Sequence, residues 1–353
     1  MRVGYTVEQC WHAVPGGTAV AALRVARELE RRADVELAYV AGRHPEPPEP
    51  EFRPTGPVAV LPLSRALLYE AWNRFNWPKV EAATGTVDVV HATGLVPAAT
   101  SVPLVVTVHD VAFLHQPEHF TRHGARTMSK SLDVIRRRAD MVICSSEATR
   151  RDLLDQRIDA ARVRVIPLGV DVVDVPPSSA DRVRRNHHLP DEFVLFVGTV
   201  EPRKNLARLA EAMESVDLPL VIAGAEGWGD DHPAAGDDIR FVGFVPDREL
   251  AALYKAATVF AYPSVREGFG LPVAEAMAQG APVVTSRGTS TEEVAGGAAV
   301  LVDPHDVADI ARGIREALDR RGELAELGRS RVSELAWETT AARTVAVYRE
   351  VLA

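Results

Sequence analysis

Short runs of β-branched and apolar residues alternate with amphipathic helical segments along the whole chain, and this alternation restricts the fold more than any other feature. In the first half the runs lie at residues 3–6, 35–40, 87–91, 104–108, 141–144 and 163–166. In the second half they lie at residues 193–197, 220–223, 239–242, 259–261, 282–285 and 299–302. Continuous apolar runs of this length are typical of strands buried on both faces, and intervening helices allow parallel pairing. The pattern predicts an α/β protein with parallel sheets.

The length of the chain predicts two domains. A single hydrophobic core rarely grows beyond about 250–300 residues, and this chain has 353. Residues 173–187 are rich in Pro, Ser and charged residues and lack clear periodicity, which is typical of an interdomain linker. We therefore expect domains over residues 1–172 and from 188 onward. Ligands of such sheets bind at the carboxyl ends of strands, so functional motifs should lie there.

Composition excludes several classes of protein. A net charge of −9 argues against a nucleic-acid binder, which needs a surplus of Lys and Arg. Two cysteines, Cys10 and Cys144, are too few for a disulfide framework and fit a reducing compartment. No stretch resembles a signal peptide or reaches the ~18 to 20 apolar residues of a membrane span. We expect a cytoplasmic protein, either soluble or peripheral on the inner face of the membrane.

The segment GTVEPRKN, residues 198–205, has the pattern of a phosphate-binding site. A predicted strand turns at Gly198, and Arg203 and Lys204 precede a helix that should start near Leu206. The amides and positive dipole end of a helix start favour phosphate, to which the two cations would add. The alternative is a solvated basic turn. The dinucleotide fingerprint GxGxxG is absent after every predicted strand, which counts against a nicotinamide enzyme.

Two glutamates lie eight positions apart in EGFGLPVAE. Glu267 lies at the tip of the loop after the strand at 259–261, and Glu275 is predicted in the first turn of a helix that begins at Pro272. Ionised carboxylates only accept hydrogen bonds and suit vicinal diols, so the pair indicates a sugar nucleotide. For Glu275 the alternative is an acid that only stabilises the helix dipole.

The residues between the two glutamates complete the predicted donor-binding loop. Gly268 and Gly270 permit close approach of the backbone to a ligand, and amides near Gly270 and Leu271 are placed to bind a phosphate. We include Phe269, which lies between the two glycines, and we place Val245, which follows the strand at 239–242, in a second tier. Together with the cations of GTVEPRKN, this loop predicts a binding site for a nucleoside diphosphate sugar.

These motifs resemble those of a known family. EGFGLPVAE matches the E-x7-E motif of retaining glycosyltransferases of family 4, which have the GT-B fold. The resemblance extends to PGGTAV near the N-terminus, VHDVAFLHQPE at 108–118, VICSSEATRRDL at 142–153, VIPLGVD at 165–171, GTVEPRKN, and AMAQGAPVVTS. It covers most of the chain and is greatest for bacterial mannosyltransferases that use GDP-mannose.

The resemblance implies two Rossmann-like, doubly wound domains that face a central cleft, with a last helix that returns from about Trp337. The first domain would then comprise residues 1–172 and 337–353, and the second residues 188–336. It also implies that Glu267 binds donor sugar hydroxyls and Glu275 the ribose. Arg203 and Lys204 would neutralise the diphosphate, so that no metal or other cofactor is required.

Four further candidate residues lie in the first half. By the resemblance His109, after the strand at 104–108, contacts the donor sugar, and the alternative is a core or surface histidine. Asp110 is a second-tier residue that either orients this imidazole or caps the next helix. Gly16 and Gly17 precede a helix, and their amides either face a donor or acceptor phosphate or form a simple tight turn.

We therefore expect a hexosyltransferase that moves a sugar, with mannose as the first choice, to a hydroxyl acceptor in polysaccharide, glycolipid or other glycoconjugate biosynthesis. Donors such as UDP-glucose, UDP-N-acetylglucosamine, or dTDP- and GDP-deoxysugars are alternatives. An epimerase or phosphorylase of the same fold, or a sensor that only binds sugar nucleotides, remains open, and product analysis distinguishes them.

Residues 119–151 are strongly basic in an otherwise acidic chain. They contain eight Arg or Lys against three Asp or Glu. This segment could bind an anionic acceptor or an anionic membrane surface. The alternative is that its charges only form the solvated face of a helix.

Overall fold

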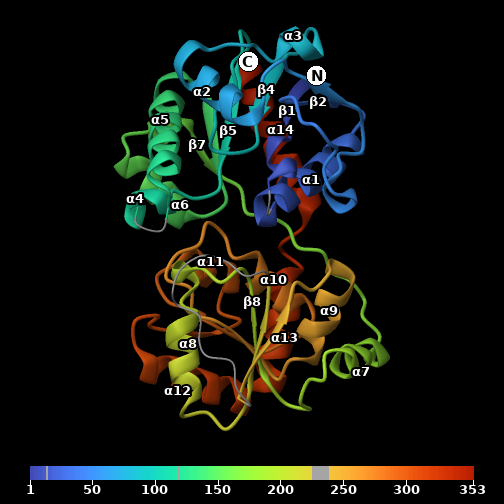
Figure 1. Ribbon diagram of the computed structural model, residues 1–353, viewed down its shortest axis with the longest axis vertical. Coiled ribbons are helices and arrows are strands. Elements are labelled where there is room, and N and C mark those ends of the chain that lie inside the picture. The colour runs from blue at the N-terminus through green and yellow to red at the C-terminus, as the bar shows by residue number, and fades with distance from the viewer. Residues whose placement is uncertain (13–14, 118–119, 225–237) are drawn as a thin grey trace. The chain divides into compact units, whose positions relative to one another are not determined.

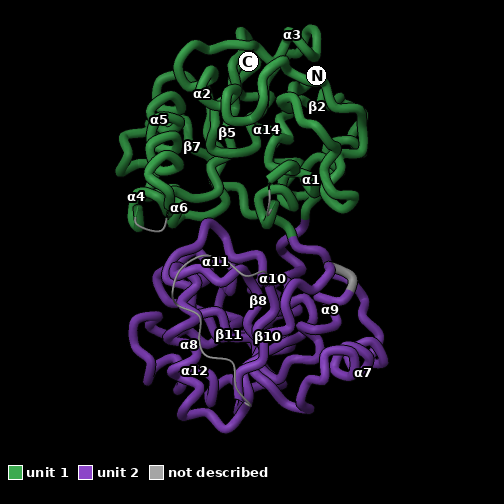
Figure 2. Tube along the Cα trace, viewed as in Figure 1, with its two compact units in different colours: residues 1–169, 337–353 green, residues 170–336 purple. Residues whose placement is uncertain are grey.

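The computed structural model describes residues 1–12, 15–117, 120–224 and 238–353. The chain divides into two compact units (Figure 2). Unit 1 comprises residues 1–169 and 337–353, and unit 2 comprises residues 170–336. Each unit contains one sheet, and every described strand pairing in both sheets is parallel. The predicted fold class is confirmed.

The sheet of unit 1 has the strand order β3-β2-β1-β4-β5-β6-β7. Its strands are β1 (Arg2–Thr6), β2 (Glu36–Ala41), β3 (Val58–Val60), β4 (Val89–Ala92), β5 (Leu104–Val108), β6 (Met141–Cys144) and β7 (Val163–Val165). The direction of winding reverses between β1 and β4, so this pair is the switch point of the sheet. Strand β3 was missed from the sequence because it is three residues long and lies half-exposed at the edge.

The sheet of unit 2 has the order β10-β9-β8-β11-β12-β13. Its strands are β8 (Val194–Val197), β9 (Leu220–Ala223), β10 (Ile239–Gly243), β11 (Val259–Tyr262), β12 (Val283–Ser286) and β13 (Val300–Val302). Here the winding reverses between β8 and β11. All four residues of both strands are buried, which explains their continuous apolar sequences. Loops that follow these two strands are therefore neighbours.

Helices cover the sheets of both units (Figure 1). Those of unit 1 are η1 (Glu8–Trp11), α1 (Gly16–Glu30), η2 (Pro50–Phe52), α2 (Arg65–Phe75), α3 (Glu81–Thr84), α4 (Ala112–His115), α5 (Arg122–Arg138), α6 (Glu147–Asp155), η4 (Ala160–Arg162) and α14 (Trp337–Leu352). Those of unit 2 are α7 (Pro177–Asn186), η5 (Pro202–Lys204), α8 (Leu206–Met213), α9 (Asp247–Ala256), α10 (Leu271–Ala278), α11 (Ser290–Ala295), α12 (Val307–Asp319) and α13 (Arg321–Val332). In unit 1, α1 packs against α14 and α2 against α5; in unit 2, α8 packs against α12 and α10 against α13.

Helix α12 illustrates how the sequence specifies these elements. Ile310, Ile314 and Ala317 recur at helical spacing and are buried. The carboxylate of Asp306 accepts hydrogen bonds from the amides of Ala308 and Asp309 at 2.9 and 3.1 Å and so caps the helix start. An apolar stripe and a polar cap together define where the helix begins and which face it buries.

Helix α14 returns to unit 1 at Trp337, the residue at which the sequence placed this return. The hydroxyl of Thr340 donates to the carbonyl of Pro167 at 2.8 Å, and the hydroxyl of Tyr348 lies 2.6 Å from Nδ1 of His91. His91 lies on β4 and is buried. The last helix is thus attached to the sheet of unit 1 by polar as well as apolar contacts.

The predicted linker at 173–187 differs from the structure. It contains helix α7, which belongs to unit 2 and packs against α9. Pro177 stands at the start of α7, where its missing N–H costs no hydrogen bond. Only Ala180 and Val183 are buried among its residues, so the apolar periodicity is too short to be recognised in the sequence.

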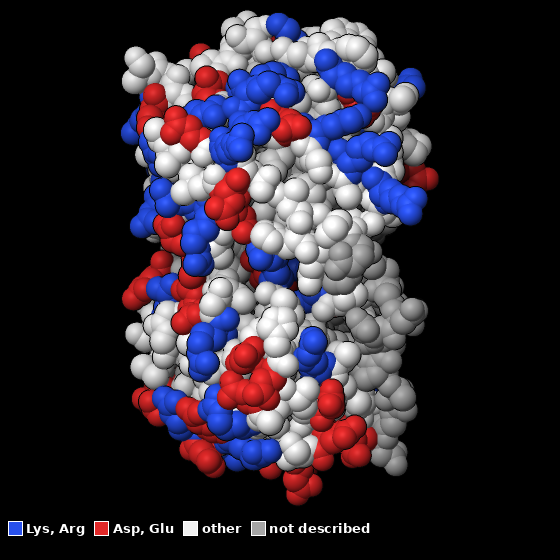
Figure 3. Space-filling view, turned by 90° about the vertical axis from the view of Figure 1, so that its left-hand side faces the viewer, with Lys and Arg blue, Asp and Glu red and all other residues white. Residues whose placement is uncertain are grey.

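Most of the basic segment forms α5, a strongly amphipathic helix. Leu132 and Ile135 are buried, whereas in the last turn Arg137 is exposed and Arg136 and Arg138 are half-buried. Residues 118 and 119 lie outside the described residues. Figure 3, which shows the side of unit 1 at the left in Figure 1, has extended blue areas of Lys and Arg interspersed with smaller red areas of Asp and Glu. Among the described residues, no helix combines the length and apolar character needed to cross a membrane.

Candidate active site

The candidate residues of unit 2 gather at the carboxyl ends of β8 and β11, the neighbouring strands at its switch point. Gly198 follows β8, and Arg203 and Lys204 lie in the short helix η5 before α8. Glu267 lies in the loop after β11. The fold therefore brings together two motifs that are more than 60 residues apart in the sequence.

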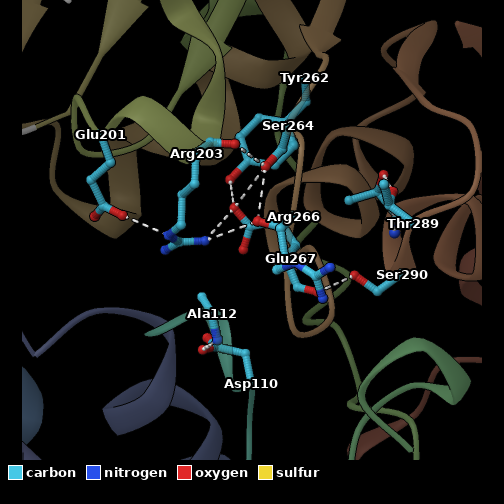
Figure 4. Close-up of polar contacts among 11 residues, drawn as sticks. Asp110, Ala112, Glu201, Arg203, Tyr262, Ser264, Arg266, Glu267, Thr289 and Ser290 are labelled. Atoms are coloured by element: carbon cyan, nitrogen blue, oxygen red, sulfur yellow. Dashed lines mark hydrogen bonds and ion pairs between the residues drawn. The ribbon is translucent and has the colours of Figure 1, made fainter. Parts of the chain in front are cut away.

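Glu267 accepts three contacts through Oε1. The hydroxyl of Tyr262 donates at 2.8 Å, Nη1 of Arg203 lies at 2.8 Å, and Oγ of Ser264 lies at 3.3 Å (Figure 4). The main-chain carbonyl of Glu267 accepts from the hydroxyl of Ser290 at 2.7 Å. Both the carboxylate and the backbone of this residue are therefore fixed. The supporting residues Tyr262, Ser264 and Ser290 were not among the candidates expected from the sequence.

The guanidinium of Arg203 lies between two carboxylates (Figure 4). Its Nε is 2.7 Å from Oε2 of Glu201, and its Nη1 is 2.8 Å from Oε1 of Glu267. Glu201 and Glu267 are only 10% and 12% exposed at their side chains. Burial raises the pKa of Glu267, but Arg203, Lys204 and the hydrogen bond from Tyr262 outweigh it and leave the pKa below its ordinary value. Glu267 is therefore ionised at neutral pH.

Lys204 is a buried cation without such a partner. The residue is 8% exposed, and its Nζ makes no ion pair or hydrogen bond to any described residue. Burial lowers the pKa of its ammonium, and Glu267 and Glu201 oppose this at longer range. Moving a charged group out of water without a partner costs on the order of several kcal/mol. An anion bound at Nζ would offset this cost.

Gly198 makes room for Lys204. Its φ is +151°, which side-chain-bearing residues rarely adopt, and a Cβ at this position would lie 2.8 Å from Nζ. The bare backbone after β8 and the ammonium therefore occupy adjacent space. The sequence motif predicted a turn at Gly198 but not this packing against Lys204.

Helix α10 begins one residue earlier than predicted, with Gly270 as its N-cap and Leu271 as its first residue. Gly270 has a φ of +105°, and a Cβ there would meet Thr291 at 2.7 Å. Gly268 and Phe269 are buried in the preceding loop. The loop is held against α11, which carries Thr291.

Glu275 does not lie in the first turn of α10, as we expected, but in the second. The shift follows from the helix start at Leu271, which places four helical residues before it. Its Oε2 accepts a hydrogen bond from the buried hydroxyl of Tyr254 at 2.9 Å. A role in stabilising the helix dipole is therefore weak, because that effect is confined to the first turn. The second-tier residue Val245 is buried after β10.

In unit 1 the candidates lie at the carboxyl ends of β1 and β5. His109 follows β5 directly, and its Nε2 lies 3.2 Å from the carbonyl oxygen of Thr93. Asp110 accepts a hydrogen bond at 3.0 Å from the amide of Ala112, the first residue of α4. This contact favours the capping role over the orientation of His109. Gly16 and Gly17 are exposed and form the first two residues of α1.

No group of three or more His, Cys, Asp or Glu side chains suited to a metal ion occurs within the described ranges. The ionisable residues that the structure brings together in unit 2 are two carboxylates, Glu201 and Glu267, and two cations, Arg203 and Lys204. Such a set can bind a dianion through the cations and a hydroxyl through a carboxylate.

Comparisons with known proteins agree with this chemistry. Residues 15–174 match the family model for Glycosyltransferase Family 4, and residues 178–331 match that for Glycosyl transferases group 1. Over 265 residues the chain is 34% identical to O-antigen chain mannosyltransferase B of Escherichia coli, covering 69% of this chain and 70% of that protein. The chain belongs to glycosyltransferase family 4. This glycosyltransferase is also 30% identical, over 388 aligned positions, to a D-inositol 3-phosphate glycosyltransferase of Acidothermus cellulolyticus, covering 96% of this chain and 86% of that one.

Solved structures resemble this glycosyltransferase along nearly its whole length. Sucrose-phosphate synthase from Thermosynechococcus elongatus matches with a TM-score of 0.78 at 22% identity, over 99% of this chain and 98% of that one. Anabaena HepE in complex with UDP and glucose matches with a TM-score of 0.75 at 18% identity, over 99% and 100% of the two chains. At these identities the likeness shows the fold, which is GT-B, as the sequence motifs predicted.

Proposed function

We propose that this glycosyltransferase moves mannose from GDP-mannose to a hydroxyl acceptor with retention of the anomeric configuration and without a metal ion. The observation that carries the proposal is the buried ammonium of Lys204, which has no partner among the described residues and lies beside Arg203. A diphosphate is an anion of the size and charge that such a site favours. The names of two relatives, O-antigen chain mannosyltransferase B and MMP alpha-(1->4)-mannosyltransferase, support mannose.

In the proposed reaction the bond between the anomeric carbon and the leaving phosphate oxygen breaks, and the acceptor oxygen forms a new bond to that carbon. The leaving diphosphate gains negative charge, which Lys204 and Arg203 stabilise together with the start of α8. The acceptor proton passes to the leaving phosphate oxygen on the same face of the sugar. Glu267 accepts donor sugar hydroxyls and Glu275 a ribose hydroxyl, since ionised carboxylates only accept.

Thermal unfolding with saturating GDP, UDP, dTDP and ADP tests the donor base. A ligand at 100 times its Kd adds ~2.7 kcal/mol of stability, enough to raise the midpoint by several degrees. We expect a shift with GDP and its loss in Lys204→Met. A shift with UDP alone would replace the mannosyl proposal by a UDP-sugar donor, and no shift with any nucleotide would refute the phosphate site.

Product analysis tests the reaction class. With GDP-mannose and a hydroxyl acceptor we expect a mannoside with the anomeric configuration of the donor, as read by NMR coupling. An inverted product would refute retention, and activity that is abolished by EDTA and restored by Mg²⁺ or Mn²⁺ would refute metal independence. Conversion of the sugar nucleotide without acceptor, to an epimer or a sugar phosphate, would indicate the other enzyme classes.

We further propose that the basic face of α5 contacts an anionic membrane surface. Exposed apolar side chains lie at the neighbouring helix α2, where Phe75 is 71% exposed and Trp77, just beyond it, is 55% exposed. The exposure of these two aromatic side chains favours an interfacial role. Co-sedimentation with vesicles of anionic phospholipid tests this: we expect binding that weakens with salt and in Phe75→Ala with Trp77→Ala, and no binding would refute it.

A further inference from the structure

A second group of charged side chains lies in unit 2, at the opposite edge of the sheet from Lys204 and Glu267. Those two residues follow the carboxyl ends of β8 and β11, whereas this group precedes the amino ends of the same strands. Asp191 and Glu192 come before β8, and residues 257–258 separate α9 from β11. The two strands have four residues each, so about 13 Å of sheet lies between the two edges. The proposed reaction uses none of the residues at this second edge.

Two hollows meet at this edge of the sheet. The smaller has a volume of about 370 Å³ and lies among the end of α9, the start of α13 and the segments before β8, β11 and β12. The larger has a volume of about 530 Å³ and lies along α7, which packs beside α9 (Figure 1), and along the loop that follows α7. Arg184 and Asp191 line both hollows. Volumes of about 300–1,000 Å³ are typical of sites for small molecules.

Basic side chains outnumber acidic ones on the walls of the two hollows. The basic residues are Arg184, Arg185, Lys255 and Arg321, and the acidic ones are Asp181, Asp191 and Glu192. Two of the acids form ion pairs at the surface. Asp181 lies 3.4 Å from Nη1 of Arg184, and its side chain is 60% exposed. Glu192 lies 3.0 Å from Nη1 of Arg321, and its side chain is 56% exposed. Exposed pairs contribute at most about 1 kcal/mol, so an anionic ligand can displace these carboxylates from their cations.

The other charges on these walls are not balanced by the residues that the structure describes. Within them, Arg185 and Lys255 form no ion pair, and Nζ of Lys255 donates to the main-chain carbonyl of Val175. Arg184 is only partly satisfied. Its Nη2 donates at 2.9 Å to the main-chain carbonyl at the end of α9, whereas its Nε is buried and has no hydrogen-bond partner among the described residues. Asp191 also forms no ion pair there. Two unpaired cations against one unpaired acid leave a net positive charge, which favours an anion.

We propose that these hollows form a second binding site of unit 2, for a sugar phosphate. The phosphate binds Arg184, Lys255 and Arg321, since guanidinium groups bind phosphate oxygens in pairs and an ammonium adds a point charge. Asp191 accepts a hydroxyl hydrogen of the sugar, because an ionised carboxylate only accepts hydrogen bonds. All four residues line the smaller hollow. The described residues that line the two hollows include no Phe, Tyr or Trp on which a nucleobase stacks, so a sugar phosphate fits better than a nucleotide. Neither the proposed donor nor the proposed reaction is needed for this site to form.

Isothermal titration of the full chain tests the site, with glucose 6-phosphate, mannose 6-phosphate, glucose and inorganic phosphate as the ligands. We expect the two sugar phosphates to bind and glucose not to bind, because the sugar alone lacks the charge that the cations recognise. Inorganic phosphate should bind about tenfold more weakly than a sugar phosphate, the size of one hydrogen bond to Asp191. If neither sugar phosphate binds, the site is refuted. If inorganic phosphate binds as tightly as they do, the role of Asp191 is refuted.

Arg321→Gln tests the cations, with Arg182→Gln as a matched control. Arg321 pairs with the exposed Glu192 at the surface, so the fold should tolerate its loss. Arg182 is another exposed arginine, on α7, that lines neither hollow. We expect Arg321→Gln to weaken the binding of glucose 6-phosphate about 10- to 150-fold, the size of a hydrogen bond to a charged group, and Arg182→Gln to leave it unchanged. Arg184→Gln should act like Arg321→Gln. Equal effects of Arg321→Gln and Arg182→Gln would indicate non-specific attraction to a basic surface and would overturn the site.

Lys204→Met separates this site from the proposed donor site, which contains Lys204. We expect glucose 6-phosphate to bind Lys204→Met as it binds the original protein, and GDP to bind Arg321→Gln as it binds the original protein. If glucose 6-phosphate is lost in Lys204→Met and retained in Arg321→Gln, it occupies the donor site and the second site is refuted. If GDP and GDP-mannose fail to bind while the binding of glucose 6-phosphate depends on Arg321, the proposed donor is wrong and the second site stands.

Discussion

Arg203 and Lys204 are adjacent cations, and we expect only the replacement of Arg203 to lower the free energy of unfolding. Arg203 is paired on two sides, with Glu201 and Glu267, whereas Lys204 is buried without an ion pair to a described residue. We therefore compare Arg203→Met with Lys204→Met. Methionine keeps much of the volume and apolar length of both side chains while removing the charge.

The magnitudes follow from these contacts. Arg203→Met leaves two carboxylates, 10% and 12% exposed, without their cation, and breaking a buried pair in this way costs about 3–5 kcal/mol. Lys204→Met breaks no ion pair and relieves the desolvation that lowers the pKa of its ammonium. Its free energy of unfolding should be unchanged or higher by about 1–2 kcal/mol.

Ligand binding should weaken in both variants. A hydrogen bond to a charged group contributes about 1.5–3 kcal/mol, so the loss of Lys204 should raise the Kd of the nucleoside diphosphate about 10- to 150-fold. Urea unfolding and isothermal titration with GDP measure the two quantities on the same samples. If Lys204→Met destabilises the protein as much as Arg203→Met while binding GDP normally, Lys204 is a structural residue and the reasoning fails.

Further outcomes follow from the same site. Glu267→Ala should abolish transfer with an unchanged far-UV CD spectrum, and full activity would exclude Glu267 from the reaction. Glu275→Gln should raise the donor KM with little change in kcat, because a ribose contact is equal in ground and transition states; a fall in kcat alone would contradict this. Gly198→Ala should weaken GDP binding at least tenfold, since its Cβ would lie 2.8 Å from Nζ of Lys204; wild-type affinity would show that the turn adapts. Burial lowers the pKa of His91 to about 3 in the folded protein, whereas its unfolded value is roughly 6.5. The free energy of unfolding should therefore be highest above pH 6.5 and fall by about 1.4 kcal/mol per pH unit below it. Urea unfolding of His91→Asn should show a smaller slope.

The strands were predictable because each is a continuous apolar run bounded by polar or turn residues, as in β5 and β9, whose predicted and observed limits coincide. Prediction failed where this signal was short. Strand β3 has three half-exposed residues, and α7 buries only two side chains, so neither leaves a periodic pattern. Glu275 lies one residue further along α10 than predicted, because Pro272 alone does not fix the helix start.

The class of the protein follows from local features of the amino-acid sequence. The alternation of apolar runs and amphipathic helices sets the parallel sheets, and the motifs GTVEPRKN and EGFGLPVAE set the chemistry near two strand ends. These are local properties, since a strand, a glycine turn and a helix start each depend on neighbouring residues.

The pairing of the side chains, in contrast, depends on the folded arrangement of distant segments. It placed Arg203 between Glu201 and Glu267, left Lys204 buried without an ion pair to a described residue, and set the carbonyl of Thr93 against His109. Each of these contacts joins the ends of different strands or loops. Charge pairing and tautomers depend on distances of a few ångströms between such segments, and a sequence pattern carries no measure of those distances.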